Sequence, residues 1–246
     1  MTNEQFQTPN PVRLEIKVAA GNIRVETSDG DQSTVALDGP PKLIDAMRVE
    51  LIGDRLVIEQ RHKLSLAGLR QWRDSIRVDA RVPHHSRVEL VTAAADAKLE
   101  GTFDGLEAQS ASGDVAVTGE LAGDAQAKTV SGNVRLPRVT GDLTVQTVSG
   151  DAVAEAVGGS VVANSVSGDV RIGSLREGQV NVKSVSGDVE LGIASGTAID
   201  VDAGSASGVL SSEVPLASAP DGDGDGPTVV IRSTTVSGDF RVFRAA

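Results

Sequence analysis

The chain has 246 residues, a formal net charge of −11 and no cysteine, which excludes disulfides, thiol catalysis and cysteine-ligated zinc. Hydrophobic residues, mainly Val and Ala, make up 39% of it and aromatic residues only 2%. The negative charge disfavours nucleic acid and anionic membrane surfaces as partners, because both carry charge of the same sign.

Residues 1–9 are expected to form a flexible N-terminus. The opening stretch MTNEQFQTPNPVRLEI lacks both the basic and the apolar region of a signal peptide. No apolar run approaches the roughly 20 residues that span a bilayer. The sequence as written therefore predicts a cytoplasmic location without membrane insertion.

Residues 10–86 contain short segments in which apolar and polar residues alternate, a pattern typical of half-buried strands. Turn signals at Asp29-Gly30 and Gly53-Asp54 separate some of them. We expect a β-rich capping region here, since the open end of a repeat structure would otherwise template aggregation. The alternating segments are VRLEIKV, NIRVET, STVALD, MRVELI, RLVIEQ and SIRVDARVP.

A basic segment ends this region. Residues 61–87 carry a net charge of +5, which leaves −16 for the rest of the chain. One interpretation is a packed edge cover with Trp72 buried. The other is a docking patch for an acidic partner, including the acidic surface of another copy. The residues that would form this patch are Arg70, Trp72, Arg73 and Arg77.

Three histidines also lie here, at His62, His84 and His85. A catalytic or metal site needs convergent side chains, whereas adjacent residues on a strand point to opposite faces. We interpret His84 and His85 as loop residues beside Pro83.

Residues 87–246 are dominated by a repeated Ser-Gly-Asp motif. Its glycines recur at a nearly constant interval, and only the last two intervals, which end at Gly208 and Gly238, are clearly longer. Further glycines lie midway, so a shorter unit occurs twice per turn. The spacing predicts a right-handed parallel β-solenoid, a two-sheet coil with about 18 residues per turn. The motif glycines are Gly113, Gly132, Gly150, Gly168, Gly187, Gly208 and Gly238.

The repeat also predicts which side chains face inward. Val170 and Ile172 alternate with a polar residue on one strand, and Val180 and Val182 do so on the opposite strand. Lys183 should face solvent. One full period before Gly113 lies Ala95-Asp96, where we expect a degenerate first turn.

The long late intervals predict loops inserted into the last turns, the larger at residues 211–228. Its DGDGDG run at 221–226 lacks the spaced ligands and terminal Glu of an EF-hand. We interpret it as a flexible acidic loop.

Stacked turns would place the motif aspartates in a column about 4.8 Å apart. Each carboxylate would accept backbone N–H groups at its own corner, as in an Asx-turn. The alternative is a column of divalent cations with oxygen ligands. Asn133 shares the column with Asp114, Asp151, Asp169, Asp188 and Asp239. A parallel column of serines is expected to bond neighbouring turns at Ser112, Ser131, Ser149, Ser167, Ser186 and Ser237.

The TVSGD repeats, the preceding region that ends in IRVDARVP, and the late loop before a last VSGD resemble a bacterial β-strand-repeat family. That family is named "putative adhesin" or a domain of unknown function. The resemblance covers about Val12 to Val242. It implies a β-helix-like solenoid without known enzymatic activity, and it carries no catalytic or ligand-binding residues to transfer.

The sequence thus favours a non-enzymatic, adhesin-like scaffold with no cofactor, which binds an unknown protein partner or a second copy of itself. A polysaccharide-acting β-helix enzyme is the first alternative. Such enzymes use paired carboxylates and aromatic platforms, but this chain has one Trp and no Tyr. A self-assembling filament is the second alternative.

Overall fold

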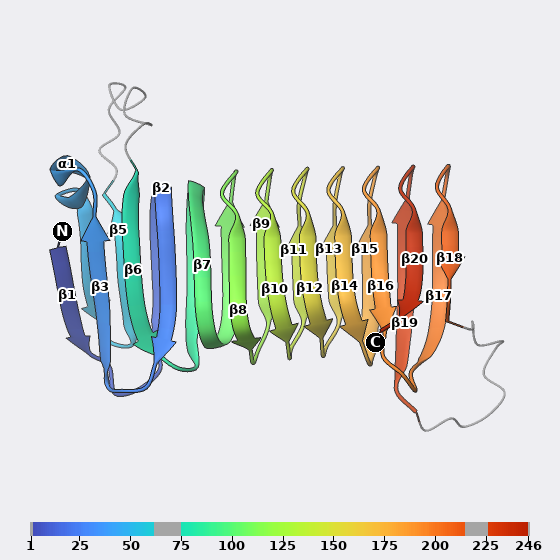
Figure 1. The fold of residues 1–246 in the computed structure, drawn as a ribbon, viewed down its shortest axis with the longest axis horizontal. Coiled ribbons are helices and arrows are strands. Elements are labelled where there is room, and N and C mark those ends of the chain that lie inside the picture. Colours follow the sequence, from blue (N-terminus) through green and yellow to red (C-terminus); the bar gives the residue numbers. More distant parts are fainter. Residues whose placement is uncertain (1, 62–74, 215–225, 246) are drawn as a thin grey trace. The chain divides into compact units, whose positions relative to one another are not determined.

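The computed structural model describes residues 2–61, 75–214 and 226–245. The chain forms two compact units, residues 1–122 and 123–246. Each is built almost entirely from β-strands (Figure 1), which confirms the all-β prediction. The units divide at residue 122, whereas the sequence predicted a boundary between the cap and the solenoid at residue 86.

The first unit is organised around one long strand, β2 (Arg13–Ser28). Its two halves pair in parallel with β5 (Arg55–Gln60) and β6 (Ile76–Pro83), and its other edge pairs in parallel with β7 (Ser86–Ser110). Strand β8 (Val115–Leu121) then pairs in parallel with β7. The regular parallel pairing therefore begins before the predicted solenoid start.

Antiparallel strands close the N-terminal edge of this unit. Strand β3 (Gln32–Asp38) pairs antiparallel with β6, and β4 (Met47–Ile52) pairs antiparallel with β5. A short helix, α1 (Pro41–Ile44), joins β3 to β4. The capping role expected for residues 10–86 stays a prediction.

The segment expected to be a flexible N-terminus contains a strand. Residues Thr2–Gln7 form β1, which pairs antiparallel with β3. The hydroxyls of Thr8 and Ser33 lie 2.7 Å apart and are buried. Without β1, the outer edge of β3 would expose a row of unpaired backbone groups, so this pairing explains why the segment is ordered.

The second unit is a parallel β-solenoid with two strands per turn (Figure 1). One sheet starts with β9 (Ala125–Thr129), β11 (Leu143–Gln146), β13 (Val161–Asn164) and β15 (Gly178–Lys183). The other starts with β10 (Val134–Val139), β12 (Ala152–Val157), β14 (Val170–Leu175) and β16 (Val189–Ile193). The register of these pairs confirms the predicted period and the parallel orientation.

The last turns do not follow the order of the sequence. Strand β19 (Thr228–Thr235) lies between β15 and β17 (Ala198–Ser205). Strand β20 (Phe240–Arg244) likewise lies between β16 and β18 (Leu210–Ser212). The two long glycine intervals are therefore explained by an intercalated turn as well as by an inserted loop. Of the predicted loop at 211–228, residues 215–225 lie outside the described residues.

The interior of the solenoid is narrow and aliphatic. Val170, Ile172, Val180 and Val182 are each at most 2% exposed, which confirms the predicted inward positions. Lys183 is exposed, as expected. Parallel in-register pairing places equivalent residues of successive turns side by side, so each aliphatic column packs against itself.

Candidate functional site

The motif corners of the second unit are closed by a hydroxyl, which is buried at Thr129, Thr147, Ser165, Ser184 and Thr235 and partly buried at Ser205. Thr147 donates a hydrogen bond to the carbonyl oxygen of Gly150 at 2.7 Å and accepts one from the Gly150 N–H at 3.0 Å. Ser184 makes the same pair of bonds with Gly187. The residue two positions before each motif serine therefore fixes the turn.

The motif glycines are required by close contact between turns. A Cβ at Gly168 would lie 2.0 Å from the carbonyl oxygen of Gly150, and one at Gly187 would lie 2.1 Å from that of Gly168. No side chain fits in that space. The glycine column thus lets successive corners stack backbone on backbone.

The aspartate column joins one turn to the next. The N–H of Asp169 donates to Asp151 Oδ1 at 3.0 Å, and the N–H of Asp188 donates to Asp169 Oδ1 at 2.8 Å. The N–H of Asp239 donates to Asp188 Oδ1 at 2.8 Å. The sequence predicted bonds within each corner. The structure instead shows bonds between corners, because in-register stacking brings each carboxylate beneath the next N–H group.

The aspartate is replaced where no further turn follows. In the motif ASGV the fourth position is Val209, whose N–H donates to Asp239 Oδ1 at 2.8 Å. Strand β18, which follows Val209, pairs with β20 on one side and is the last strand of its sheet in the described chain. A carboxylate is not needed where no N–H group follows.

In the first unit, the predicted degenerate turn has the same bond. Asp114 N–H donates to Asp96 Oδ1 at 3.0 Å. Within residues 2–61, 75–214 and 226–245, no group of three or more His, Asp or Glu side chains is arranged to hold a metal ion. The cation column remains a prediction for solution experiments.

The serine column also bonds neighbouring turns, as predicted. Ser167 Oγ donates to the Val148 carbonyl at 3.2 Å, and Ser186 and Ser237 make equivalent bonds. The polar groups of the corner are therefore used inside the fold.

Sequence reasoning missed a second ladder at the other corner. Asp142 N–H donates to Asp124 Oδ1 at 2.9 Å, and Ser160 N–H donates to Asp142 Oδ1 at 2.7 Å. The signal was present in the repeated Gly-Asp of GDA and GDL, halfway between the motifs.

A column of exposed valines lies beside the motif serines. These side chains are 43–52% exposed, and each stacks on its equivalents in the adjacent turns. Its members are Val130, Val148, Val166, Val185 and Val236.

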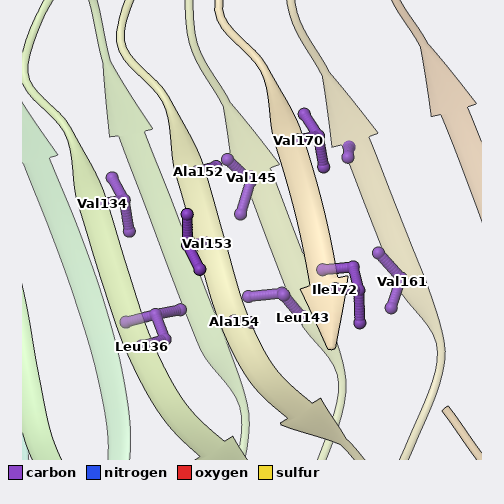
Figure 2. A pocket seen from close by; sticks show the side chains of 11 residues that line it. Val134, Leu136, Leu143, Val145, Ala152, Val153, Ala154, Val161, Val170 and Ile172 are labelled. Atoms are coloured by element: carbon purple, nitrogen blue, oxygen red, sulfur yellow. The ribbon is translucent and has the colours of Figure 1, made fainter. Parts of the chain in front are cut away.

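The interior offers little space for a ligand. Figure 2 shows the aliphatic side chains that line a cavity between the two sheets, among them Leu136, Ala154 and Ile172. The volume of this cavity is about 10 Å³. That volume is about one water molecule, and an apolar lining gives water no partners. An acyl chain does not fit in this cavity.

One outer face of the second unit is polar and lacks acidic residues. We call it the polar face and define it as the outward side chains of β9, β11, β13, β15 and β19. None of these strands contains Asp or Glu. One register column comprises Lys128, Gln146, Asn164, Lys183 and Thr234. The adjacent column comprises Gln126, Thr144, Val162, Asn181 and Arg232.

The cations of the polar face form no ion pair within the described residues. Lys128, Lys183 and Arg232 make no ion pair with any residue that the structure describes. Lys183 and Arg232 are exposed, and Arg232 lies in register with Asp202 on β17.

The opposite sheet of the same unit differs. Its outward Arg171 pairs with Glu190 at 2.5 Å and lies 5.6 Å from the centre of the Phe243 ring. Arg241 pairs with Glu213 at 2.5 Å. Arg171 and Arg241 are thus engaged within the fold, whereas Arg135 and Arg138 on β10 are exposed and form no ion pair with the described residues.

The first unit is also neutralised internally. Arg24 bridges Glu26 at 2.8 Å and Glu100 at 3.1 Å, and Lys98 lies 2.6 Å from Glu100. The hydrogen bonds from Lys98 and Arg24 hold the pKa of Glu100 below its usual value. This network neutralises Arg24, Lys98, Glu26 and Glu100 within the fold.

The two described histidines flank the turn from β6 to β7. His84 Nδ1 lies 2.8 Å from Thr27 Oγ1, and His85 Nδ1 lies 2.7 Å from Asp104 Oδ1. Each therefore has its own partner, in agreement with their interpretation as loop residues. His62 lies outside the described residues.

The predicted basic docking patch is only partly described. Arg77 lies on β6, where it is exposed and in register with Asn22 and Asp38. Arg70, Trp72 and Arg73 lie outside the described residues. The structure therefore tests neither interpretation of this segment.

Comparison with known families places the fold in context. The family model described as Toastrack DUF4097 matches residues 12–242. No curated protein sequence matches the chain.

Solved structures show the same fold at low sequence identity. A "putative adhesin" from Bacteroides fragilis is 12% identical with a TM-score of 0.57, covering 98% of this chain and 96% of that one. A "putative lipid binding protein" from Parabacteroides distasonis is 16% identical with a TM-score of 0.59, with the same coverage. A "putative adhesin" from Parabacteroides merdae is 11% identical with a TM-score of 0.55, covering 98% and 95%.

Proposed function

The chain belongs to the Toastrack DUF4097 family, and from that premise we propose that it is a non-enzymatic, adhesin-like binding scaffold. In this proposal the solenoid is a rigid support, and one of its outer faces engages the partner. The observation that carries it is the pair of corner ladders, in which carboxylate oxygens bond the backbone of the next turn.

The ladders support a scaffold because they fix the spacing of every outward side chain. A partner that binds several turns meets groups already held in register, so less conformational entropy is lost on binding. The names of the similar structures refer to adhesion and lipid binding, not to catalysis. We extend that coarse function to this chain.

Two alternatives come from the sequence. A polysaccharide-acting enzyme would shorten its substrate and release fragments. A filament would form through stacking of copies. If copies instead associate through the basic patch, which binds acidic surfaces, their association should be sensitive to salt. Charge reversal at Arg70, Arg73 and Arg77 tests the patch, because it should abolish salt-sensitive association without lowering the melting temperature.

Cosedimentation tests the scaffold proposal. The folded full chain is mixed with envelope polymers, envelope membranes and a cytosolic extract from the native host, with thermally unfolded chain as the control. We expect saturable binding to one fraction by the folded chain alone, with no release of soluble fragments. Fragments would support the enzyme, and absence of binding to every fraction would overturn the proposal.

Fractionation of the same host tests where the chain resides. No helix in the described parts of the chain is long and apolar enough to cross a membrane. The cytoplasmic location expected from the sequence stays a prediction.

A further inference from the structure

The polar face of the second unit carries cations and no acidic residue, although the chain as a whole is acidic. The chain carries a net charge of −11. Five adjacent strands nevertheless have no acidic residue, and their cations Lys128, Lys183 and Arg232 make no ion pair with the described residues. We infer that this face binds a linear anionic polysaccharide, laid across the strands along the stack of turns. This inference rests on the proposed binding function.

The chemistry of the columns fits such a ligand. Gln146 and Asn164 lie in register between Lys128 and Lys183. Amides both donate and accept hydrogen bonds, as sugar hydroxyls do, and ammonium or guanidinium groups bond carboxylates or sulfates. The face thus provides both kinds of contact that an acidic glycan requires.

The geometry fits a repeating polymer. Successive strands lie about 4.8 Å apart, a distance comparable with the length of one sugar ring in an extended chain. Lys128 and Lys183 are three strands apart, so roughly 14 Å separates their backbone positions. Arg232 lies on the next strand. Consecutive sugars can therefore meet consecutive turns.

Acidic residues border the face and confine the ligand. Asp124 and Asp142 lie just before β9 and β11, and their carboxylates belong to the second ladder. Asp200 and Asp202 are on β17, the strand beyond β19. These groups repel an anionic chain, so binding is restricted to the five strands between them.

Other macromolecules fit less well. Single-stranded nucleic acid is held by aromatic side chains on which bases stack, and the five strands contain none. An anionic membrane needs larger apolar groups that insert beside the cations, whereas the exposed large apolar side chain on these five strands is Val162.

The experiment measures binding of polygalacturonate to the full-length protein. The test variant combines Lys128→Glu, Lys183→Glu and Arg232→Glu. The control combines Arg135→Glu, Arg138→Glu and Arg176→Glu, which reverses three exposed charges elsewhere in the same unit. We expect the test variant to lose about tenfold or more in affinity and the control to stay within about twofold. Urea unfolding verifies that both variants fold.

A neutral variant separates recognition from charge alone. Gln146→Ala with Asn164→Ala leaves the charge unchanged and should weaken binding by about threefold or more, since each amide removed costs a hydrogen bond. Neutral dextran should bind at least about tenfold more weakly than polygalacturonate. Binding should also fall between about 0.05 M and about 0.5 M NaCl.

Several results would overturn the inference. Equal weakening by the two triple variants would show that the face has no special role. Tighter binding of poly(dT), of phosphatidylserine vesicles or of a second copy would assign the face to another partner. If the chain binds one of the host fractions saturably but does not bind polygalacturonate, this inference is refuted and the scaffold proposal is retained.

Discussion

Replacement of one motif glycine by alanine tests the stacking of the corners directly. A Cβ at Gly168 would lie 2.0 Å from the Gly150 carbonyl oxygen, well inside the 3.0 Å that real Cβ atoms keep. The corner must therefore open, which weakens the bonds from Ser167 N–H to the Val148 carbonyl and from Asp169 N–H to Asp151 Oδ1. We expect Gly168→Ala to lower the free energy of unfolding by about 2–4 kcal/mol.

Gly204 is the matched control, because it lies in a strand of the same unit with nothing within 4 Å of its Cβ position. Gly204→Ala should be neutral or stabilise the fold by about 0.5–1 kcal/mol, since alanine restricts the unfolded chain. Urea unfolding followed by far-ultraviolet circular dichroism gives both values. If Gly168→Ala cost no more than Gly204→Ala, the corners would not be in backbone contact and the stacking argument would fail.

Three further predictions concern the same unit. Val182→Asp buries an unpaired charge and should cost several kcal/mol, whereas Lys183→Asp on the outer side of the strand should cost only tenths; equal losses in urea unfolding would reverse our assignment of inside and outside. Asp169→Asn keeps an Oδ1 acceptor, as Asn133 does naturally, and should lower the free energy of unfolding by less than about 0.5 kcal/mol. Asp169→Ala leaves the Asp188 N–H without its bond and should lower it by about 1–2 kcal/mol. Millimolar calcium should leave the melting temperature nearly unchanged, and a rise of many degrees would instead indicate the cation column.

The repeated motif made most of the second unit predictable. Glycine spacing and alternation in segments such as Val180 to Lys183 indicated the period, the parallel pairing and the inward side chains, because each depends on local sequence. The direction of the aspartate bonds was not predictable, since bonding within a corner and between corners uses the same residues. Only the register of stacked turns distinguishes the two.

The order of the strands at the ends was also beyond local patterns. Nothing in β19 or β20 states that they insert between earlier strands, although Val209 in the aspartate position indicates the last turn. The pairing of Thr2–Gln7 depends on the free edge of β3, which only the assembled sheet reveals. The segments of the polar face can be found in the sequence as AQAKT, LTVQ, VVAN and GQVNVK. That they form one surface follows only from the pairing of these strands with one another.

The intercalated turn has a consequence for synthesis. Domains begin to fold from the N-terminus while the chain emerges from the ribosome. Strands β17 and β18 emerge before β19 and β20, yet they pair with those later strands. The last turns therefore assemble only after residue 244 has been synthesised. If the messenger RNA were truncated before the codon for residue 228, the chain would lack β19 and β20, the strands with which β17 and β18 pair.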